Sequence, residues 1–408
     1  MTVCILGGAQ SDFARNLARA GEGIEALARE VIEGALVDAG IEPSAVESIH
    51  VGNAFGELLL PPAQTRSPPT TLFPELWGVP AVRHEAACAS GSMAVLGAMA
   101  EIEAGRYDAV LVLGIEQERN VPGDLATRHL GAAAYIGHEA DRCRYMWPHL
   151  FDQVAAEYER RYGLDHAHLA AIARKNFDNA RKNPLAQTRR WQLDERHFGD
   201  DAEHNPIVEG RLRRHDCSQL TDGAACLVLT SERFAEEHAR RRGARAERVP
   251  RILGWGHRTA GLSLVQKLEH SREQPYVFPH ARRAALDALE RAGLGSVREL
   301  HGIEAHDCFS ITEYVAIDHL GITEPGQSQR AVESGELRLG GSLPMNPSGG
   351  LMGLGHPVGA TGVRMLWDAA RQVSGRAGEN QVEGASRFAT FNIGGSCTTV
   401  ASFVVGSD

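Results

Sequence analysis

Lysine and long apolar runs are both scarce in this sequence. Of its 408 residues only three are lysine, at positions 175, 182 and 267, and none completes the G-x-x-x-x-G-K motif of a phosphate-binding loop. The chain also lacks G-x-G-x-x-G and G-x-S-x-G, which argues against a dinucleotide site and a serine hydrolase. No stretch of about 18 apolar residues could span a membrane, and the N-terminus lacks a signal-peptide cleavage site. We therefore expect a cytoplasmic globular protein without a membrane segment.

Positive charge and paired cysteines are limited as well. The formal net charge is −10, so the protein is not expected to bind nucleic acid. Its seven cysteines are scattered without a C-x-x-C pair, which favours reduced thiols over disulfides. Arginine nevertheless clusters in the segments 189–198, 210–215 and 238–251. These clusters are either solvated helix faces or local sites for a phosphorylated ligand, and the sequence leaves both interpretations open.

An internal repeat organises the chain. The segments 35–55 and 288–309 share a helix ending in Ala-Gly, a short connection and an apolar strand. Gly40 to Asn53 and Gly293 to His306 are both thirteen steps. Because the order of elements also agrees further along, we predict an α/β fold with duplicated halves.

The stretch 117–216 differs in character from both halves. It is rich in Arg, His and Asn and contains two amphipathic helical segments, 151–163 and 168–183, the second ended by Pro184. After it, residues 221–243 read as a strand followed by a helix, which would return the chain to the first sheet. We therefore predict a first half from residues 1–116 and 217–250, an inserted loop domain 117–216, and a second half 251–408.

Cys88 stands among small residues in the segment 84–95, HEAACASGSMAV. Apolar residues in 92–105 recur at helical steps, so the cysteine is predicted at a helix N-terminus, where the dipole favours a thiolate. The alternative is a small buried apolar side chain in an Ala-rich segment.

Three further segments carry candidate chemistry. His356 lies in the glycine-rich run 349–362, GGLMGLGHPVGATG, where backbone can approach closely. His306 and Cys308 are two residues apart, so they face the same way if their strand continues. Gly394 and Gly395 follow an apolar strand, and their N–H groups could bind an oxyanion. Taken alone, each histidine could equally be a buried structural side chain, Cys308 a buried thiol, and the two glycines part of a tight turn.

The tripeptide His-Asp-Cys occurs at 215–217 and again at 306–308. Imidazole and thiolate are zinc ligands, but structural zinc sites usually space one ligand pair by two to four residues, and H-x-C does not. No bound metal is therefore predicted.

Together these motifs resemble the thiolases, and within them the sterol-carrier-protein-type branch. The segments ACASGS, HDCFS, GGLMGLGHPVGATG and NIGGS occur in the family's order and cover nearly the whole chain. The resemblance implies a five-layered α/β/α/β/α fold with an inserted loop domain. It also implies a homodimer or homotetramer, and coenzyme A thioesters as substrates with no bound cofactor.

The resemblance also assigns roles. Cys88 matches the acyl-accepting cysteine, and His356 matches the histidine that activates it and helps to form an oxyanion hole. His306 stands where the larger branch has the asparagine of Asn-Glu-Ala-Phe. Many thiolases carry an acid/base cysteine in C-x-G-G, but here Asn392 occupies that position, so the resemblance assigns the acid/base role to Cys308.

The predicted site includes further residues. Gly394, Gly395, Ser218 and His149 are expected to bind substrate, and Cys397 is given no role. The sequence thus predicts an acyltransferase that forms or cleaves a 3-oxoacyl-CoA through a cysteine acyl-enzyme. Alternatives are a C-acyltransferase or carbon–carbon lyase acting on a non-CoA acceptor, a ketoacyl synthase, and a catalytically silent scaffold or lipid-binding partner.

Overall fold

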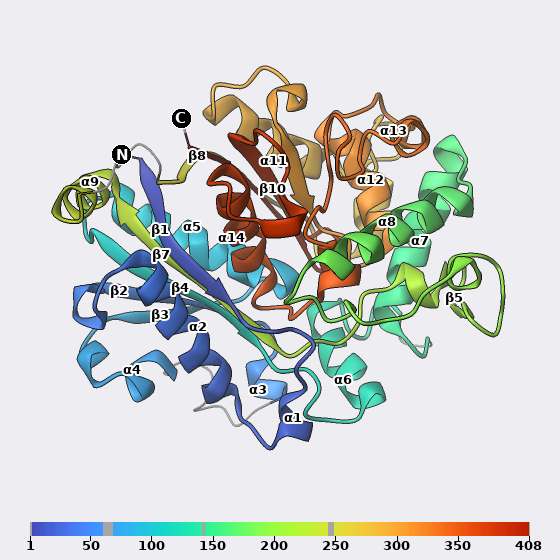
Figure 1. Ribbon diagram of the computed structural model, residues 1–408. Coiled ribbons are helices and arrows are strands. Elements are labelled where there is room, and N and C mark those ends of the chain that lie inside the picture. The colour runs from blue at the N-terminus through green and yellow to red at the C-terminus, as the bar shows by residue number, and fades with distance from the viewer. Residues whose placement is uncertain (1, 60–67, 141–142, 244–248, 408) are drawn as a thin grey trace.

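The computed structural model describes residues 2–59, 68–140, 143–243 and 249–407 (Figure 1). The strands are β1 (Val3–Gln10), β2 (Ser48–Gly52), β3 (Ala81–His84), β4 (Ala109–Glu116), β5 (Ile207–Glu209), β6 (Leu212–Arg213), β7 (Gly223–Ser231), β8 (Arg251–Thr259), β9 (Gly302–Ala305), β10 (Arg387–Gly394) and β11 (Thr399–Gly406). The helices are α1 (Leu17–Ala20), α2 (Ile24–Ala39), α3 (Gly56–Leu59), α4 (Pro68–Leu72), α5 (Ser90–Glu103), α6 (Gly123–Leu130), α7 (Met146–Tyr162), α8 (His166–Lys182), α9 (Glu232–Arg241), α10 (Leu264–His270), α11 (Pro279–Arg291), α12 (Ser310–Leu320), α13 (Ser328–Ser334) and α14 (Thr361–Val373).

The large strands form two halves that join edge to edge. The order is β3-β2-β4-β7-β1 in the first half and β8-β11-β10-β9 in the second. Strands β1 and β8 pair antiparallel at Val3 with Ile252 and Cys4 with Arg251, which links the halves into one nine-stranded sheet. Strand β7 lies between β4 and β1, so the chain returns to the first half after the insertion, as the sequence predicts.

The predicted duplication is visible element by element. Helix α2 and strand β2 correspond to α11 and β9, and each connection begins with a left-handed glycine, Gly40 at φ 67° and Gly293 at φ 71°. Only glycine adopts this conformation without strain, which explains the Ala-Gly ending shared by the two segments. The parallel bridge between Ile303 and Met345 stands where β3 pairs with β2 in the first half.

Side chains on the two faces of each half enter different cores. On β4, Val110 and Val112 pack in the core that contains α5 and α14, whereas Leu111 and Leu113 pack against α2. On β11, Phe403 faces the shared core, whereas Val400 and Val404 face the core of α11 and α12. Helices α5 and α14 are therefore enclosed between the two halves, with α2 and α11 outside them. This is the predicted five-layered arrangement.

The inserted stretch packs on the second half of the fold. Helices α7 and α8 lie beside α12 (Figure 1) and share its core, to which they contribute Leu150, Phe151, Leu169 and Phe177. Helix α8 ends at Lys182, two residues before Pro184, because proline lacks the N–H and disfavours helix in the residue before it. The limits of the inserted domain and of the two halves stay a prediction.

Acidic side chains accompany the arginine clusters. Arg189 pairs with Asp12, and Arg211 pairs with Asp152 and Glu159, as expected for solvated surface segments. Residues 244–248 of the third cluster lie outside the described part of the chain. Among the described residues, no helix is long and apolar enough to cross a membrane.

Candidate active site

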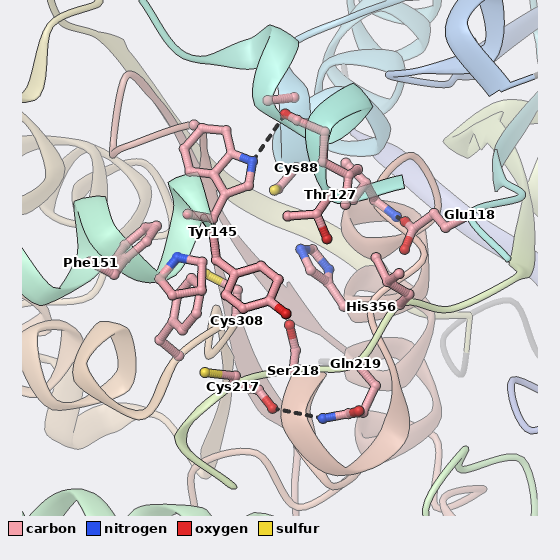
Figure 2. A pocket seen from close by; sticks show the side chains of 18 of the residues that line it. Cys88, Glu118, Thr127, Tyr145, Phe151, Cys217, Ser218, Gln219, Cys308 and His356 are labelled. Carbon is pink, nitrogen blue, oxygen red and sulfur yellow. Dashed lines mark hydrogen bonds between the residues drawn. The ribbon is translucent and has the colours of Figure 1, made fainter. Parts of the chain in front are cut away.

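A cavity of about 280 Å³ lies where the two halves and the inserted stretch meet (Figure 2). Cys88, Cys308 and His356 line it, and Figure 2 shows them with Ser218 and Gln219 around one space. The rest of the wall is largely apolar and aromatic: Phe55, Leu130, Tyr145, Trp147, Pro148, Phe151, Val208, Leu220, Phe309 and Val358. The cavity thus combines nucleophilic and basic groups with a wall suited to an apolar substrate.

Cys88 is held in a short 3₁₀ turn between β3 and α5. The preceding residue, Ala87, has φ 50°, a backbone conformation that residues other than glycine rarely adopt. Helix α5 begins at Ser90, two residues after the cysteine, which confirms the predicted place at a helix start. The backbone N–H groups of Cys88 and Gly395 face its sulfur and lower its pKa. The binding of an oxyanion by these N–H groups, which the glycine motif predicts, stays a prediction.

Burial nevertheless outweighs the helix start. Desolvation, together with the nearby buried carboxyl group of Glu118, raises the pKa of the Cys88 thiol to about 12. The sequence argument from the helix dipole expected a favoured thiolate, and this part of it is wrong for the resting site. The reason is that burial penalises the charged form by more than the N–H groups compensate.

His356 follows a π-helical turn, Gly350–Leu354, and precedes α14. Its Nδ1 lies 2.8 Å from Thr361 Oγ1, and that hydroxyl donates its only proton to the Pro357 carbonyl. Nδ1 must therefore carry the imidazole proton, which leaves Nε2 as the acceptor. Burial lowers the pKa of His356 to about 3, so the ring is neutral at physiological pH. These properties suit a general base for a neutral thiol.

His306 lies beyond the end of β9, with its backbone N–H bonded to the Phe391 carbonyl. Its ring packs edge-on against that of His356, with centroids 5.3 Å apart. Cys88 Sγ and one ring nitrogen from each histidine lie within 4.8 Å of one another. Burial lowers the pKa of His306 well below its usual range, so this ring too is neutral.

Cys308 lines the cavity, whereas His306 is not among its lining residues. The two-residue spacing predicted a common direction only if the strand continued, and β9 ends at Ala305. The side chain of Cys308 is buried, and desolvation raises the pKa of the thiol well above its usual range, with Cys88 as a near neighbour. The carbonyl of Cys308 accepts a 2.8 Å bond from the Ser218 N–H. Both predicted residues, Cys308 and Ser218, therefore line the cavity.

Asp307, between His306 and Cys308 in the sequence, directs its carboxyl group toward residues 351 and 352. Its carboxyl group accepts the N–H groups of Leu351 and Met352 in the turn that leads to His356. The two His-Asp-Cys tripeptides lie side by side, because Cys217 and Phe309 form an isolated antiparallel β-bridge. Among the described residues, the group close enough to share a metal is Cys88 with His306 and His356, not either tripeptide. Metal independence stays a prediction.

The other predicted residues separate into two sets. Gly395 lines the cavity, and Gly394 packs so closely below it that a Cβ would lie 2.2 Å from the Ala86 carbonyl oxygen. His149 does not line the described cavity, since its ring lies against Gln153 and Glu209. The structure therefore brings Gly395 to the other site residues and leaves His149 apart from them.

Lys267 supports the turn after Gly395. Its buried ammonium donates to Ser396 Oγ at 2.9 Å and to Thr398 Oγ1 at 2.8 Å, and burial lowers its pKa to about 8. Cys397, within that turn, is buried away from the described cavity. The carbonyl of Cys397 accepts a bond from His280 Nε2.

Sequence reasoning missed several residues of the site. Glu118 is a buried carboxyl group in the cavity wall that accepts the N–H groups of Thr221 and Val358. The aromatic wall was missed too, and so were the contacts of His356 with Thr361 and of His306 with Asn392. Only the departure from C-x-G-G at Asn392 was a signal in the sequence.

The chain is similar to two family models and to several known proteins. Residues 3–233 match the family model "Thiolase, N-terminal domain", and residues 263–407 match "Thiolase C-terminal domain-like". An acetyl-CoA acetyltransferase of Methanothermobacter thermautotrophicus is 32% identical over 371 residues, 90% of each chain. Sterol carrier protein 2 of Rattus norvegicus is 30% identical over 387 residues, which are 90% of this chain and 65% of that protein.

Two solved structures share the fold. One, the Ltp2-ChsH2(DUF35) aldolase, has a TM-score of 0.76 at 19% identity, with 99% of this chain and 97% of that chain covered. An acetyl-CoA acetyltransferase from Syntrophomonas wolfei has a TM-score of 0.68 at 19% identity, covering 100% of this chain and 99% of the other.

The fold and the site define an α/β enzyme in which Cys88 lies beside two neutral histidines. The chain belongs to the thiolase family. The predicted class, a thiolase-type acyltransferase, is thereby confirmed.

Proposed function

We propose that this thiolase transfers an acyl group from a coenzyme A thioester to Cys88 and then forms or cleaves a 3-oxoacyl-CoA. The observation that carries the proposal is the approach of Cys88 Sγ to the ring nitrogens of His306 and His356, all within 4.8 Å. A nucleophile, a neutral base and a second imidazole at one end of an apolar cavity are what acyl transfer requires.

In the first half-reaction, His356 Nε2 takes the Cys88 proton as sulfur attacks the thioester carbonyl. The oxyanion then accepts hydrogen bonds from the N–H groups of Cys88 and Gly395, which face the Cys88 sulfur in the resting protein. Collapse expels the coenzyme A thiolate, which recovers the proton from His356, and leaves an acyl-enzyme. Because thiol and imidazole are both neutral at rest, proton transfer accompanies attack rather than preceding it.

In the second half-reaction, Cys308 removes an α-proton from a second acyl-CoA, and a hydrogen bond from His306 stabilises the enolate oxygen. The enolate carbon attacks the acyl-enzyme carbonyl, a carbon–carbon bond forms, and the departing Cys88 thiolate takes the proton that Cys308 removed, which returns Cys308 to its thiolate. Run backwards, the same steps are thiolysis. Burial, with Cys88 and Asp307 nearby, raises the pKa of Cys308. The hydroxyl group of Thr312 and the backbone N–H of Phe309 act in the opposite direction and lower the cost of its thiolate.

The wall of the cavity supports an apolar acyl group larger than acetyl. A water-sized group occupies about 30 Å³, so a three-atom acetyl group fills only about a third of this space. Glu118 is the one carboxyl group among the described lining residues, and no lysine or arginine lines the cavity. A second cavity of about 560 Å³ shares Gln219 and Leu220 with it and carries Arg19 and Arg119, which suit coenzyme A phosphates.

The test is a panel of acyl-CoA thioesters, from acetyl to octanoyl and benzoyl, with mass spectrometry of the intact protein and of the products. We expect an adduct on the peptide that contains Cys88, no adduct in Cys88→Ser, and higher kcat/KM for the larger acyl groups. Acyl-pantetheine thioesters, which lack the nucleotide phosphates, should show a higher KM. An adduct confined to Cys308 or Cys397 would overturn the assignment, and full activity after chelation is expected.

Assembly and location stay predictions. We expect a homodimer or homotetramer, which light scattering after gel filtration measures. The similar structure of the Ltp2-ChsH2(DUF35) aldolase is named for two proteins. The alternative to a homo-oligomer is therefore a complex of this chain with a DUF35-type partner. A cytoplasmic location is tested by fractionation of cells.

A further inference from the structure

Asn392, on β10, connects three segments that carry the active site. Its side-chain Nδ2 lies 3.2 Å from the Cys88 carbonyl oxygen and 3.0 Å from His306 Nδ1. Its Oδ1 accepts a 2.7 Å bond from Ser92 Oγ, at the start of α5. The asparagine is completely buried, and within the described part of the chain these are the hydrogen-bond contacts of its side-chain amide.

The orientation of this amide is determined by its partners. A backbone carbonyl can only accept, so the group that faces Cys88 O must be the NH₂ group. The same NH₂ group faces His306 Nδ1, and it can only donate. His306 Nδ1 must therefore be the unprotonated nitrogen. Because the ring is neutral, its one proton resides on Nε2.

This arrangement is the reverse of the one at His356. There the Thr361 hydroxyl, already donating to the Pro357 carbonyl, accepts the Nδ1 proton and leaves Nε2 without one. Two neutral imidazoles whose rings are 5.3 Å apart are thus set in opposite tautomers by one side chain each. His356 therefore carries a lone pair on Nε2, whereas His306 carries an N–H group there.

We infer that Asn392 is a positioning residue that fixes His306 as the Nε2–H tautomer and so makes it an oxyanion donor. The inference rests on the proposed function for its catalytic consequence, while the tautomer itself is a property of the resting protein. Without Asn392, His306 could expose a lone pair toward the developing oxyanion, which would repel it. The residue acts through His306 and does not touch the reacting atoms.

The first experiment measures the tautomer directly. Nitrogen-15 NMR of histidine-labelled protein distinguishes protonated from unprotonated ring nitrogens, and His306→Asn identifies the signals of this ring by their loss. We expect Nε2–H in the wild type and Nδ1–H in Asn392→Asp, because a carboxylate only accepts. Ser92→Ala, which removes a contact to the other end of the amide, is the matched control and should keep Nε2–H. Nδ1–H in the wild-type protein would overturn the inference, whatever the variants do.

The second experiment separates tautomer control from simple support of the fold. Loss of one oxyanion donor typically lowers kcat by about 10²–10³-fold, and we expect a loss of that order in Asn392→Asp. In a His306→Asn background the donor is a carboxamide, which has no tautomers, so adding Asn392→Asp should change kcat by less than about threefold. Equal losses in the two backgrounds would show a structural role and refute the inference.

The two experiments also distinguish failure of the inference from failure of the proposed function. If the wild-type enzyme forms no acyl adduct on Cys88 with any thioester, the proposed function fails while the NMR result still decides the tautomer. If adducts form and the NMR spectrum shows Nδ1–H, the inference about Asn392 fails while the function stands.

Discussion

The resting state of Cys88 leads to a prediction that needs no knowledge of the substrate. Desolvation raises the pKa of its thiol to about 12, and burial lowers that of His356 to about 3, so the pair is neutral rather than a thiolate and an imidazolium. At pH 8 a thiol of pKa about 12 is about one part in ten thousand ionised, against about one part in ten for a thiol of pKa about 9. Alkylation, which requires the thiolate, should therefore be slower by about a thousandfold.

The assay is the rate of iodoacetamide labelling of the Cys88 peptide, followed by mass spectrometry from pH 6 to pH 10. We expect the rate to rise about tenfold per pH unit without a plateau, because the thiolate fraction grows in that proportion below the pKa. The same peptide in urea-unfolded protein is the control and should level off near pH 9. A plateau near pH 6 or 7 in the folded enzyme would reveal a thiolate–imidazolium pair and refute the reasoning.

Two further predictions concern Cys308 and His356. Cys308→Ala should still become acylated at Cys88 but lose exchange of the α-proton of acyl-CoA with solvent by about 10²–10⁴-fold, and an exchange rate within about threefold of wild type would exclude this base. His356 has its pKa lowered to about 3, so the unfolded chain gains a proton below about pH 6.5 that the folded chain does not, and stability falls as the pH falls. At pH 5 this amounts to about 2 kcal/mol, so in urea unfolding His356→Asn should lose about 2 kcal/mol less than wild type between pH 7 and pH 5; equal losses would show that His356 is not the group responsible.

Much of the fold could be predicted because its signals are local. The Ala-Gly helix endings at Gly40 and Gly293, the proline after α8 and the apolar strands each depend on a few adjacent residues. Repetition of those signals at equal spacing then gave the duplicated topology. The edge-to-edge pairing of β1 with β8 could not be predicted, because it depends on how the two halves pack.

The site was predictable to the level of residue types but not of their protonation. Cys88, His306, Cys308 and His356 were found from motif order, and the structure brings all four together. The state of each group depends on partners elsewhere in the chain: Asn392 is 86 residues from His306 and 304 residues from Cys88. Burial, which reverses the expected effect of the helix start on Cys88, likewise results from packing rather than from neighbouring residues.

The glycines around the site show why its two halves must meet as they do. A Cβ on Gly91 would lie 2.8 Å from the Gly359 carbonyl oxygen, and one on Gly362 would lie 2.3 Å from Ser92 Oγ. The first turns of α5 and α14 therefore pack nearly backbone to backbone between the two halves of the sheet. Since Cys88 lies two residues before α5 and His356 five residues before α14, this close approach of two helix starts is what places the nucleophile beside its base.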